Sequence, residues 1–169
     1  MIPRHPIVDT GLLFDFLLSR FAAAENLPQL LVQHPLRYLT PKHYRDAVTW
    51  YFMVGHPIMT SPHVIAELHG HAEKRLRGGY LSRFWELART ELMQLGLQEE
   101  TTALLEMDGG VLASLGPTDT SLLHVALRLR ELSRPVLTEE RILAGQCQKK
   151  NVPVLRLADV LTLWQQHAR

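Results

Sequence analysis

The chain has very little cysteine, no long uncharged apolar run and almost no net charge. Cys147 is the only cysteine among 169 residues, which excludes an internal disulfide and a multi-cysteine metal site and favours a reducing, cytoplasmic setting. The apolar stretch at residues 7–18 is interrupted by Asp9 and Asp15, and no small-residue cleavage site follows it, so we do not expect a secretory signal. No other apolar run is long enough to cross a bilayer. The sequence therefore predicts a soluble protein with no membrane segment.

The charge balance and length place the chain among ordinary globular domains. Lysine and arginine number 18 against 17 aspartates and glutamates, a formal net charge of +1 that neither requires nor excludes a nucleic-acid partner. Apolar residues make up 46% and charged residues 21% of the chain. With no repeat, linker or low-complexity tract, residues 1–169 are expected to form one domain. The sequence has no glycine-rich phosphate loop, which disfavours a doubly wound nucleotide-binding regulator. It also has no Ser–His–Asp signature of a hydrolase.

Four short apolar runs each precede a helical pattern. Runs that are apolar on both faces and alternate with helices are typical of buried parallel strands, so we expect an α/β fold. The strands are predicted within residues 5–8, 57–60, 135–138 and 152–155, and the helices that follow them at 11–24, 62–77, 139–150 and 158–167.

The middle of the chain is more helical. Further helices are predicted at residues 41–52, 80–95, 102–115 and 120–132, with Gly116-Pro117 separating the last two, and residues 97–101 could hold a short strand. The helix at 41–52 carries an aromatic-rich stripe of Tyr44, Val48, Tyr51 and Phe52. We favour a core position for this stripe; the alternative is an interface with a second copy or with a partner helix.

Two carboxylates of the first half occupy positions from which they could reach a shared crevice. Asp9 directly follows the first predicted strand, where an aspartate also serves as a helix N-cap. Glu67 borders the buried stripe of its helix, where an unpaired charge is costly. The alternative for Glu67 is solvent exposure, or pairing with His63, His71 or Lys74.

Two further acidic positions begin helices in the second half. Asp119 opens the helix after Gly116-Pro117, and Glu139 and Glu140 follow Thr138, a plausible N-cap. The helix dipole alone accounts for acids at these places. Ligands of parallel sheets bind outside the carboxyl ends of the strands, however, and clustered carboxylates stay ionised only when cations neutralise them. The acids together therefore indicate a Mg²⁺ or Mn²⁺ site able to act on a phosphodiester.

In their order and context these acids resemble the PIN-domain family. That family has an Asp after the first strand, a Glu on a helix, an Asp opening a later helix and a Thr-x-Asp after a strand, and the resemblance spans nearly the whole chain. The matching segments are I-V-D-T at residues 7–10, T-S-P-H-V-I-A-E-L at 60–68, P-T-D-T-S-L-L-H-V-A at 117–126 and V-L-T-E-E-R-I-L at 136–143.

The resemblance implies a three-layer α/β/α fold with a central parallel sheet and a Mg²⁺- or Mn²⁺-dependent endoribonuclease. Its catalytic and metal-binding residues would be Asp9, Glu67, Asp119 and Glu140. Thr10 and Thr138 would be supporting hydroxyls beside the metal. Many relatives are toxins held by an antitoxin protein, and others process RNA. Two departures stand out: Glu140 replaces the usual Asp, and the interval between Asp9 and Glu67 is longer than in compact toxins.

Other polar features have simpler interpretations. His69-Gly70-His71 resembles a zinc motif, but residues two apart on a helix face different ways. Cys147 is expected to be a small buried hydrophobe rather than a nucleophile. If RNA binds, the basic cluster at the end of the helix containing Glu67 is the predicted phosphate contact, although a solvated helix end explains it equally well. This cluster consists of Lys74, Arg75, Arg77 and Arg83.

Two functions therefore remain open. The first is a metal-dependent endoribonuclease, with RNA as substrate and an antitoxin or a second copy as further partners. The second is a catalytically silent PIN-like module that binds RNA or a protein, for which Glu140 is the main indication.

Overall fold

Five short parallel strands form one sheet at the centre of the molecule. The computed structural model describes residues 2–32, 42–103 and 106–167. The strand order is β3-β2-β1-β4-β5, and every neighbouring pair is parallel. The strands are β1 (Ile7–Val8), β2 (Met59–Thr60), β3 (Gln98–Glu99), β4 (Val136–Leu137) and β5 (Val154–Leu155). Four of them lie within the predicted runs, and β3 settles the open question at residues 97–101.

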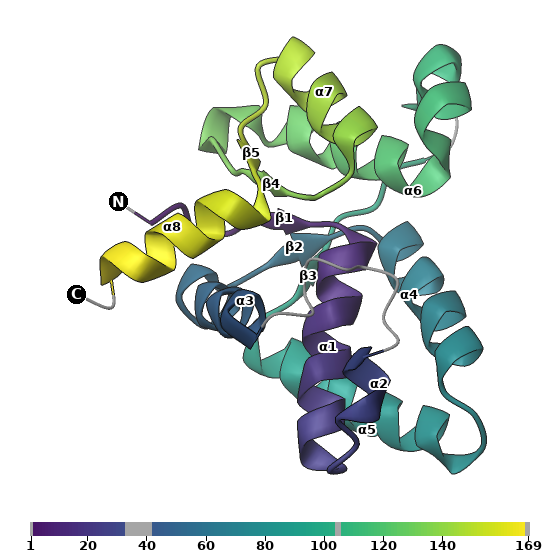
Figure 1. Cartoon of the computed structure of the whole chain (residues 1–169). Helices are drawn as coiled ribbons and strands as arrows, with labels where there is room; N and C mark the ends of the chain where they lie inside the picture. Colours follow the sequence, from purple (N-terminus) through teal and green to yellow (C-terminus); the bar gives the residue numbers. More distant parts are fainter. Residues whose placement is uncertain (1, 33–41, 104–105, 168–169) are drawn as a thin grey trace.

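Helices cover both faces of this sheet. They are α1 (Thr10–Ala24), α2 (Gln29–Val32), α3 (Lys42–Gly55), α4 (Pro62–Arg75), α5 (Gly79–Gln94), α6 (Gly109–Arg128), η3 (Arg130–Leu132), α7 (Arg141–Lys149) and α8 (Leu157–His167). Strands β1 to β3 are added toward one edge of the sheet, whereas β4 and β5 are added toward the other edge. With right-handed crossovers, this change places α1 to α5 on one face of the sheet and α6 and α7 on the other. Contacts agree: α1 packs against α3, α4 and α5, whereas α6 packs against α7 (Figure 1). The predicted three-layer α/β/α fold is confirmed.

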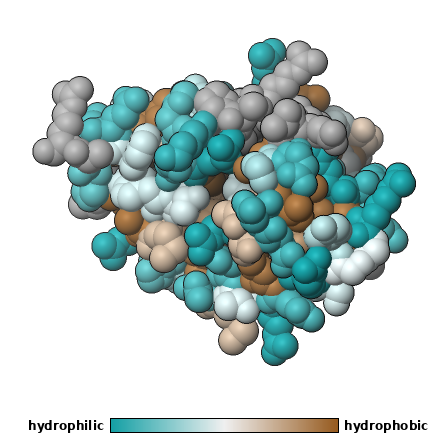
Figure 2. Space-filling model, turned by 60° about the horizontal axis from the view of Figure 1, so that its bottom comes forward, coloured by the Kyte–Doolittle hydropathy of each residue, from teal (hydrophilic) through white to brown (hydrophobic). Residues whose placement is uncertain are grey.

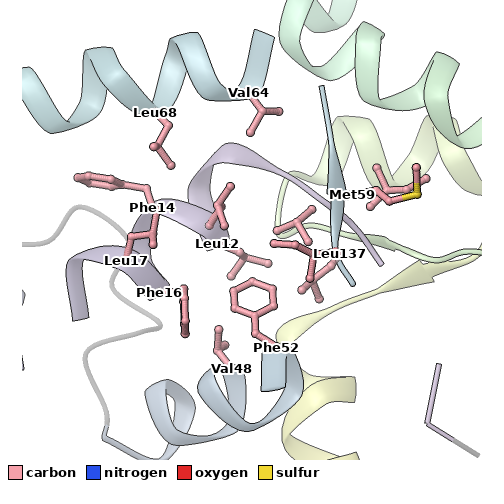
Figure 3. Close-up of a cluster of buried hydrophobic side chains, with 14 of the residues drawn as sticks. Leu12, Phe14, Phe16, Leu17, Val48, Phe52, Met59, Val64, Leu68 and Leu137 are labelled. Carbon is pink, nitrogen blue, oxygen red and sulfur yellow. The ribbon is translucent and has the colours of Figure 1, made fainter. Parts of the chain in front are cut away.

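Helix α1 is the centre of the larger layer. The helix predicted at residues 11–24 is observed as α1, which buries ten of its 15 residues because α2, α3, α4 and α5 all contact it. Leu12, Phe16 and Leu17 point from α1 into a cluster that includes Phe52 of α3 and Leu68 of α4 (Figure 3). The position of α1 therefore fixes Asp9 and Thr10 at its first turn.

The aromatic stripe of α3 belongs to the core. Val48, Tyr51 and Phe52 are buried, and the Tyr51 hydroxyl donates a hydrogen bond of 2.9 Å to the carbonyl of Pro3. Tyr44 is partly buried against the same cluster. The core interpretation is confirmed and the interface alternative is wrong for this stripe. The predicted start of this helix at residue 41 lies outside the described residues.

Helix α6 bends where the sequence places a break. Gly116 has φ 78° and ψ 171° inside the helix, and Pro117 begins the second segment. The first segment starts at residue 109 rather than 102, because the Asp108 carboxylate accepts hydrogen bonds from the backbone N–H groups of Gly110 and Val111. The second ends at Arg128 and continues as η3. The bend brings the start of the second segment to the carboxyl edge of the sheet.

The described surface is mostly polar. Large exposed hydrophobic residues are scattered over different elements. Figure 2 shows one face, where small hydrophobic patches lie among hydrophilic side chains. Within the described ranges, no helix is both long and apolar enough to cross a membrane.

The bend at Gly116 gives a test of backbone strain. Gly116→Ala should destabilise the fold by about 1–3 kcal/mol, because a Cβ is disfavoured at this φ and ψ. Gly145 in α7 is the matched control: its φ is helical and an added Cβ would meet nothing within 4 Å. Gly145→Ala should stabilise by roughly 0.5–1 kcal/mol. Urea unfolding of both variants measures the difference; equal effects would contradict it.

Candidate functional site

A cleft of about 510 Å³ opens at the carboxyl edge of the sheet. The four acids singled out in the sequence all line it, although each comes from a different part of the fold. Asp9 follows β1, Glu67 lies on α4 after β2, Asp119 begins the second segment of α6, and Glu140 follows β4. The order β2-β1-β4 makes three of these positions neighbours. The remaining lining residues are Thr10, Gly11, Phe14, His71, Leu115, Gly116, Pro117, Thr118 and Glu139.

Asp9 is both a helix cap and a wall of this cleft. Its carboxylate accepts a hydrogen bond of 3.1 Å from the backbone N–H of Leu12, so the N-cap interpretation is confirmed. Hydrogen bonds from the Thr138 hydroxyl and from the backbone N–H of Glu139 reach the same carboxylate. Burial outweighs these bonds, and the charge of Glu140 adds to it, so the pKa of Asp9 rises to about 6.

The carboxylates of Glu139 and Glu140 have different surroundings. The Glu139 carboxylate accepts a 2.5 Å hydrogen bond from the backbone N–H of Leu157, at the start of α8, and pairs with Arg156 at 3.2 Å. Glu140 is exposed at the N-cap of α7, where its side chain makes no capping bond, and its backbone N–H donates to Thr138 at 2.9 Å. The carboxylate available to the cleft is therefore that of Glu140.

The Glu67 carboxylate contacts Thr10 and His71 at the cleft. The Thr10 hydroxyl donates a hydrogen bond of 2.7 Å to Glu67, which ties α4 to the first turn of α1. The imidazole of His71, one turn further along α4, lies 3.9 Å from the other Glu67 oxygen. Of the pairing partners considered for Glu67, His71 is the one in contact. The Glu67 side chain is 45% exposed and lines the cleft.

Asp119 is the most perturbed acid of the cleft. Burial, which is the largest cause, and the charges of Asp9, Glu140 and Glu67 together raise its pKa to about 7. These three contributions show that the four carboxylates share one electrostatic field. The thiol of Cys147 on α7 has a pKa raised to about 12, mainly by burial and also by the charge of Asp119. This agrees with an inert buried cysteine.

A buried hydroxyl pair, which the sequence did not single out, holds Asp119 and Glu67 in relative position. Ser61, before α4, and Ser121, on α6, are fully buried with their hydroxyl oxygens 2.6 Å apart. Ser121 also donates a 2.6 Å hydrogen bond to the carbonyl of Thr118. The pair lies between the helices that carry the two acids, so it fixes their spacing. The sequence analysis missed this pair because no local sequence pattern predicts that the two serines are buried.

The donor set suits a hard divalent cation. Carboxylate oxygens are the ligands that Mg²⁺ and Mn²⁺ prefer, and the mutual repulsion that raises the pKa of Asp119 is what a cation would relieve. Within the described part of the chain, no three His, Cys, Asp or Glu side chains already stand together at metal-ligand positions. Glu67 is held by Thr10, and like charges keep the others apart, so binding would require side chains to turn inward.

The predicted basic cluster lies away from the acids. Lys74 and Arg75 are in the last turn of α4, about 10 Å beyond Glu67 at 1.5 Å per residue. Arg75 donates to the carbonyl of Leu30 at 3.0 Å, and Arg83 pairs with Glu25 at 2.7 Å. Lys74 and Arg77 are exposed. The structure therefore separates this cluster from the cleft and occupies half of it with internal contacts.

The two histidines flanking Gly70 do face different ways. His71 stacks on Phe14, with ring centroids 5.7 Å apart, and lines the cleft. His69 stacks on Trp85 at 5.6 Å and does not line it. A shared zinc site on this pair is therefore wrong.

The raised pKa of Asp119 predicts a stability that depends on pH. In metal-free protein the folded state holds this proton up to about pH 7, whereas the unfolded chain loses it near pH 4. Folding stability is therefore lost as pH rises between these values. Asp119→Asn removes this loss, about 2.7 kcal/mol over two pH units, so its melting temperature relative to the wild type should rise by roughly 5–10 °C between pH 5 and pH 8.

Asp108 supplies the matched control for that measurement. It opens the first segment of the same helix, and hydrogen bonds from Val111 and Gly110 lower its pKa. Asp108→Asn keeps a good N-cap and should show no such rise in calorimetry with EDTA present. An Asp119→Asn curve parallel to the wild type would contradict the electrostatic coupling of the cleft.

Comparison of the chain with models of known protein families, with characterised proteins and with solved structures finds no match. The interpretation of the cleft therefore rests on its own geometry and on the order of its motifs.

Proposed function

We propose that the chain is a metal-dependent endoribonuclease that hydrolyses RNA phosphodiester bonds at the acidic cleft. One observation carries this proposal: four carboxylates from four separate parts of the fold line a single cleft at the carboxyl edge of a parallel sheet. Each acid alone has an ordinary structural explanation. Convergence of all four does not, because bringing like charges together raises the free energy of the folded protein.

The lining of the cleft suits a cation-dependent reaction on an anionic substrate. As far as the structure describes it, the lining contains neither lysine nor arginine. An acidic cleft of this kind repels a phosphodiester by itself. Mg²⁺ or Mn²⁺ held by Asp9, Glu67, Asp119 and Glu140 would supply an activated water and neutralise charge on the phosphate.

The neighbouring hydroxyls have positioning roles in this proposal. Thr138 donates to the Asp9 carboxylate and accepts from the backbone N–H of Glu140, so it orients one acid and the backbone that carries the other. Thr10 does the same for Glu67. These contacts restrict the carboxylates of Asp9 and Glu67 beside the cleft before any ligand arrives, so that fewer side chains have to be ordered when a metal binds.

RNA as the substrate, and an antitoxin as a partner, come from the resemblance to PIN domains. A toxin of a toxin–antitoxin pair in the cytoplasm is the finer form of the proposal. A small DNA-binding protein encoded beside this chain would support it. The aromatic stripe considered for a homodimer is buried, so a dimer would need another surface.

A silent PIN-like module that binds RNA or protein is the second candidate. Glu140, in place of the usual Asp, is exposed and makes no capping bond, and the acids are not yet gathered at ligand distances in the described residues. Metal-dependent cleavage separates this candidate from the nuclease.

Mn²⁺ titration tests the metal site directly. At a concentration about 100 times the dissociation constant, Mn²⁺ should stabilise the wild type by about 2.7 kcal/mol and raise its melting temperature by roughly 5–10 °C. Asp9→Asn keeps the N-cap but removes the carboxylate, so the rise should be much smaller. RNA cleavage should fall by more than about a hundredfold, since even groups that only orient metal ligands contribute about 10- to 100-fold.

Asp108→Asn makes the same chemical change at another helix N-cap and should keep both the Mn²⁺ response and the cleavage. Equal melting-temperature rises in the wild type and Asp9→Asn would remove Asp9 from the metal site. Cleavage that persists in EDTA would contradict the metal-dependent mechanism itself.

The adjacent glutamates provide a second test with opposite readouts. Glu140→Ala should strongly reduce metal-dependent cleavage with little change in stability, and Glu140→Asp should retain or improve it. Glu139→Ala should cost about 1–2 kcal/mol, because the start of α8 loses its cap and Arg156 loses its partner. It should leave cleavage nearly intact. Loss of cleavage in Glu139→Ala but not in Glu140→Ala would reverse these assignments.

A further inference from the structure

The same cleft has an apolar wall beside its acids. Phe14 of α1 and His71 of α4 stack there, with ring centroids 5.7 Å apart and planes inclined by 27°. Phe84 of α5 packs edge-on against Phe14 at 6.1 Å and is fully buried. Phe14 itself is 4% exposed. The stack is therefore supported from the core and offers a fixed aromatic surface.

His71 is the accessible part of this stack. Its side chain is 46% exposed, although one side of the imidazole faces Phe14. Because a planar ring has two faces, the imidazole keeps surface available for another planar group. The electrostatics of the site do not require His71, since Glu67 has its hydrogen bond from Thr10.

The second part of the wall comes from the bend in α6. Leu115 and Pro117 line the cleft on either side of Gly116, whose φ of 78° sets the direction of the chain. This bend also begins the segment that carries Asp119. The apolar wall and the acids are thus parts of one cavity, and His71 lies 3.9 Å from Glu67.

From this arrangement we propose that the wall formed by His71, Phe14, Leu115 and Pro117 is a subsite for one unpaired base of single-stranded RNA. The subsite adjoins the phosphate bound at the acids, and in that respect the inference rests on the proposed function. A cavity of about 510 Å³ is of the size that holds a small ligand such as a nucleotide. Histidine and phenylalanine rings are surfaces on which splayed RNA bases stack.

The composition of the wall indicates what it selects. No described lining residue is Asn, Gln, Lys or Arg, the side chains that most often read base edges. Stacking accepts every base, because every base has a π face. A base inside a duplex is already stacked and paired, so it would have to be extruded to enter. The subsite therefore selects unpaired RNA and shows little preference for sequence.

Binding to a hydrolysis-resistant phosphorothioate RNA, short and unstructured, tests the subsite in the presence of Mn²⁺. One abasic nucleotide is moved along the strand, and affinity is followed by fluorescence anisotropy. The affinity of the wild-type protein should fall about tenfold or more when the abasic nucleotide occupies one particular position. His71→Ala should bind the unmodified strand about tenfold more weakly and should lose this position dependence. His71→Phe preserves an aromatic face and should retain both.

His69→Ala is the matched control, because His69 lies on the same helix and stacks on Trp85 outside the cleft. It should behave as the wild type. Wild-type affinity in His71→Ala, a failure of the single strand to bind, or equally tight binding of duplex RNA would each overturn the proposal.

Cleavage of the corresponding unmodified RNA distinguishes this failure from failure of the nuclease. His71→Ala should raise KM about tenfold and leave kcat within a few-fold. Position-dependent binding without cleavage would retain the subsite and reject the nuclease. Cleavage with a KM indifferent to His71→Ala would retain the nuclease and reject the subsite.

Discussion

The carboxylate of Asp9 is the point at which the two layers of helices and the sheet are joined at the cleft. It caps α1 through Leu12 and accepts hydrogen bonds from Thr138 and from the backbone of Glu139, which follow β4. Strands β1 and β4 are neighbours, so this contact requires the reversal of strand order at β1. The side chain is 5% exposed. One buried acid therefore ties the start of α1 to the segment before α7, which carries Glu140.

Burial and like charges oppose the ionised form of these acids more strongly than hydrogen bonds support it. Burial is the largest cause that raises the pKa of Asp9 to about 6 and that of Asp119 to about 7, and the charges of neighbouring acids contribute to both values. A fold selected only for stability would place apolar or uncharged groups here, since burying a charge is costly. The hydroxyls of Thr10 and Thr138 reduce the cost without removing it. Strain of this kind, concentrated in one cleft, is typical of functional sites.

The strands that could be predicted from the sequence are those whose burial on both faces requires a run of apolar residues. β1, β2 and β4 are buried on both faces and appear as apolar runs, whereas β3 has exposed residues and gave only an open question. The sequence predicted α1 as a helix but not the extent of its burial, which arises because four other helices contact it. Asp9 and Glu140 were found from their positions after strands, Glu67 from its place beside the buried stripe of a helix, and Asp119 from its place at the start of a helix. The division between Glu139 and Glu140 could not be, because it depends on Arg156, on a distant segment that local pattern does not include.

The separation of positive charge from the cleft bears on how RNA would be held. Lys74 and Arg77 are exposed near the far end of α4, whereas Arg75 and Arg83 are occupied by internal contacts. Long-range attraction from two such residues is weak at physiological salt, because charges separated by more than about 8 Å are screened. The lining of the cleft, where described, contains no lysine or arginine. In the proposed function a divalent cation is therefore needed to bind the phosphate as well as to activate water, and stacking on an apolar wall supplies affinity that salt does not screen.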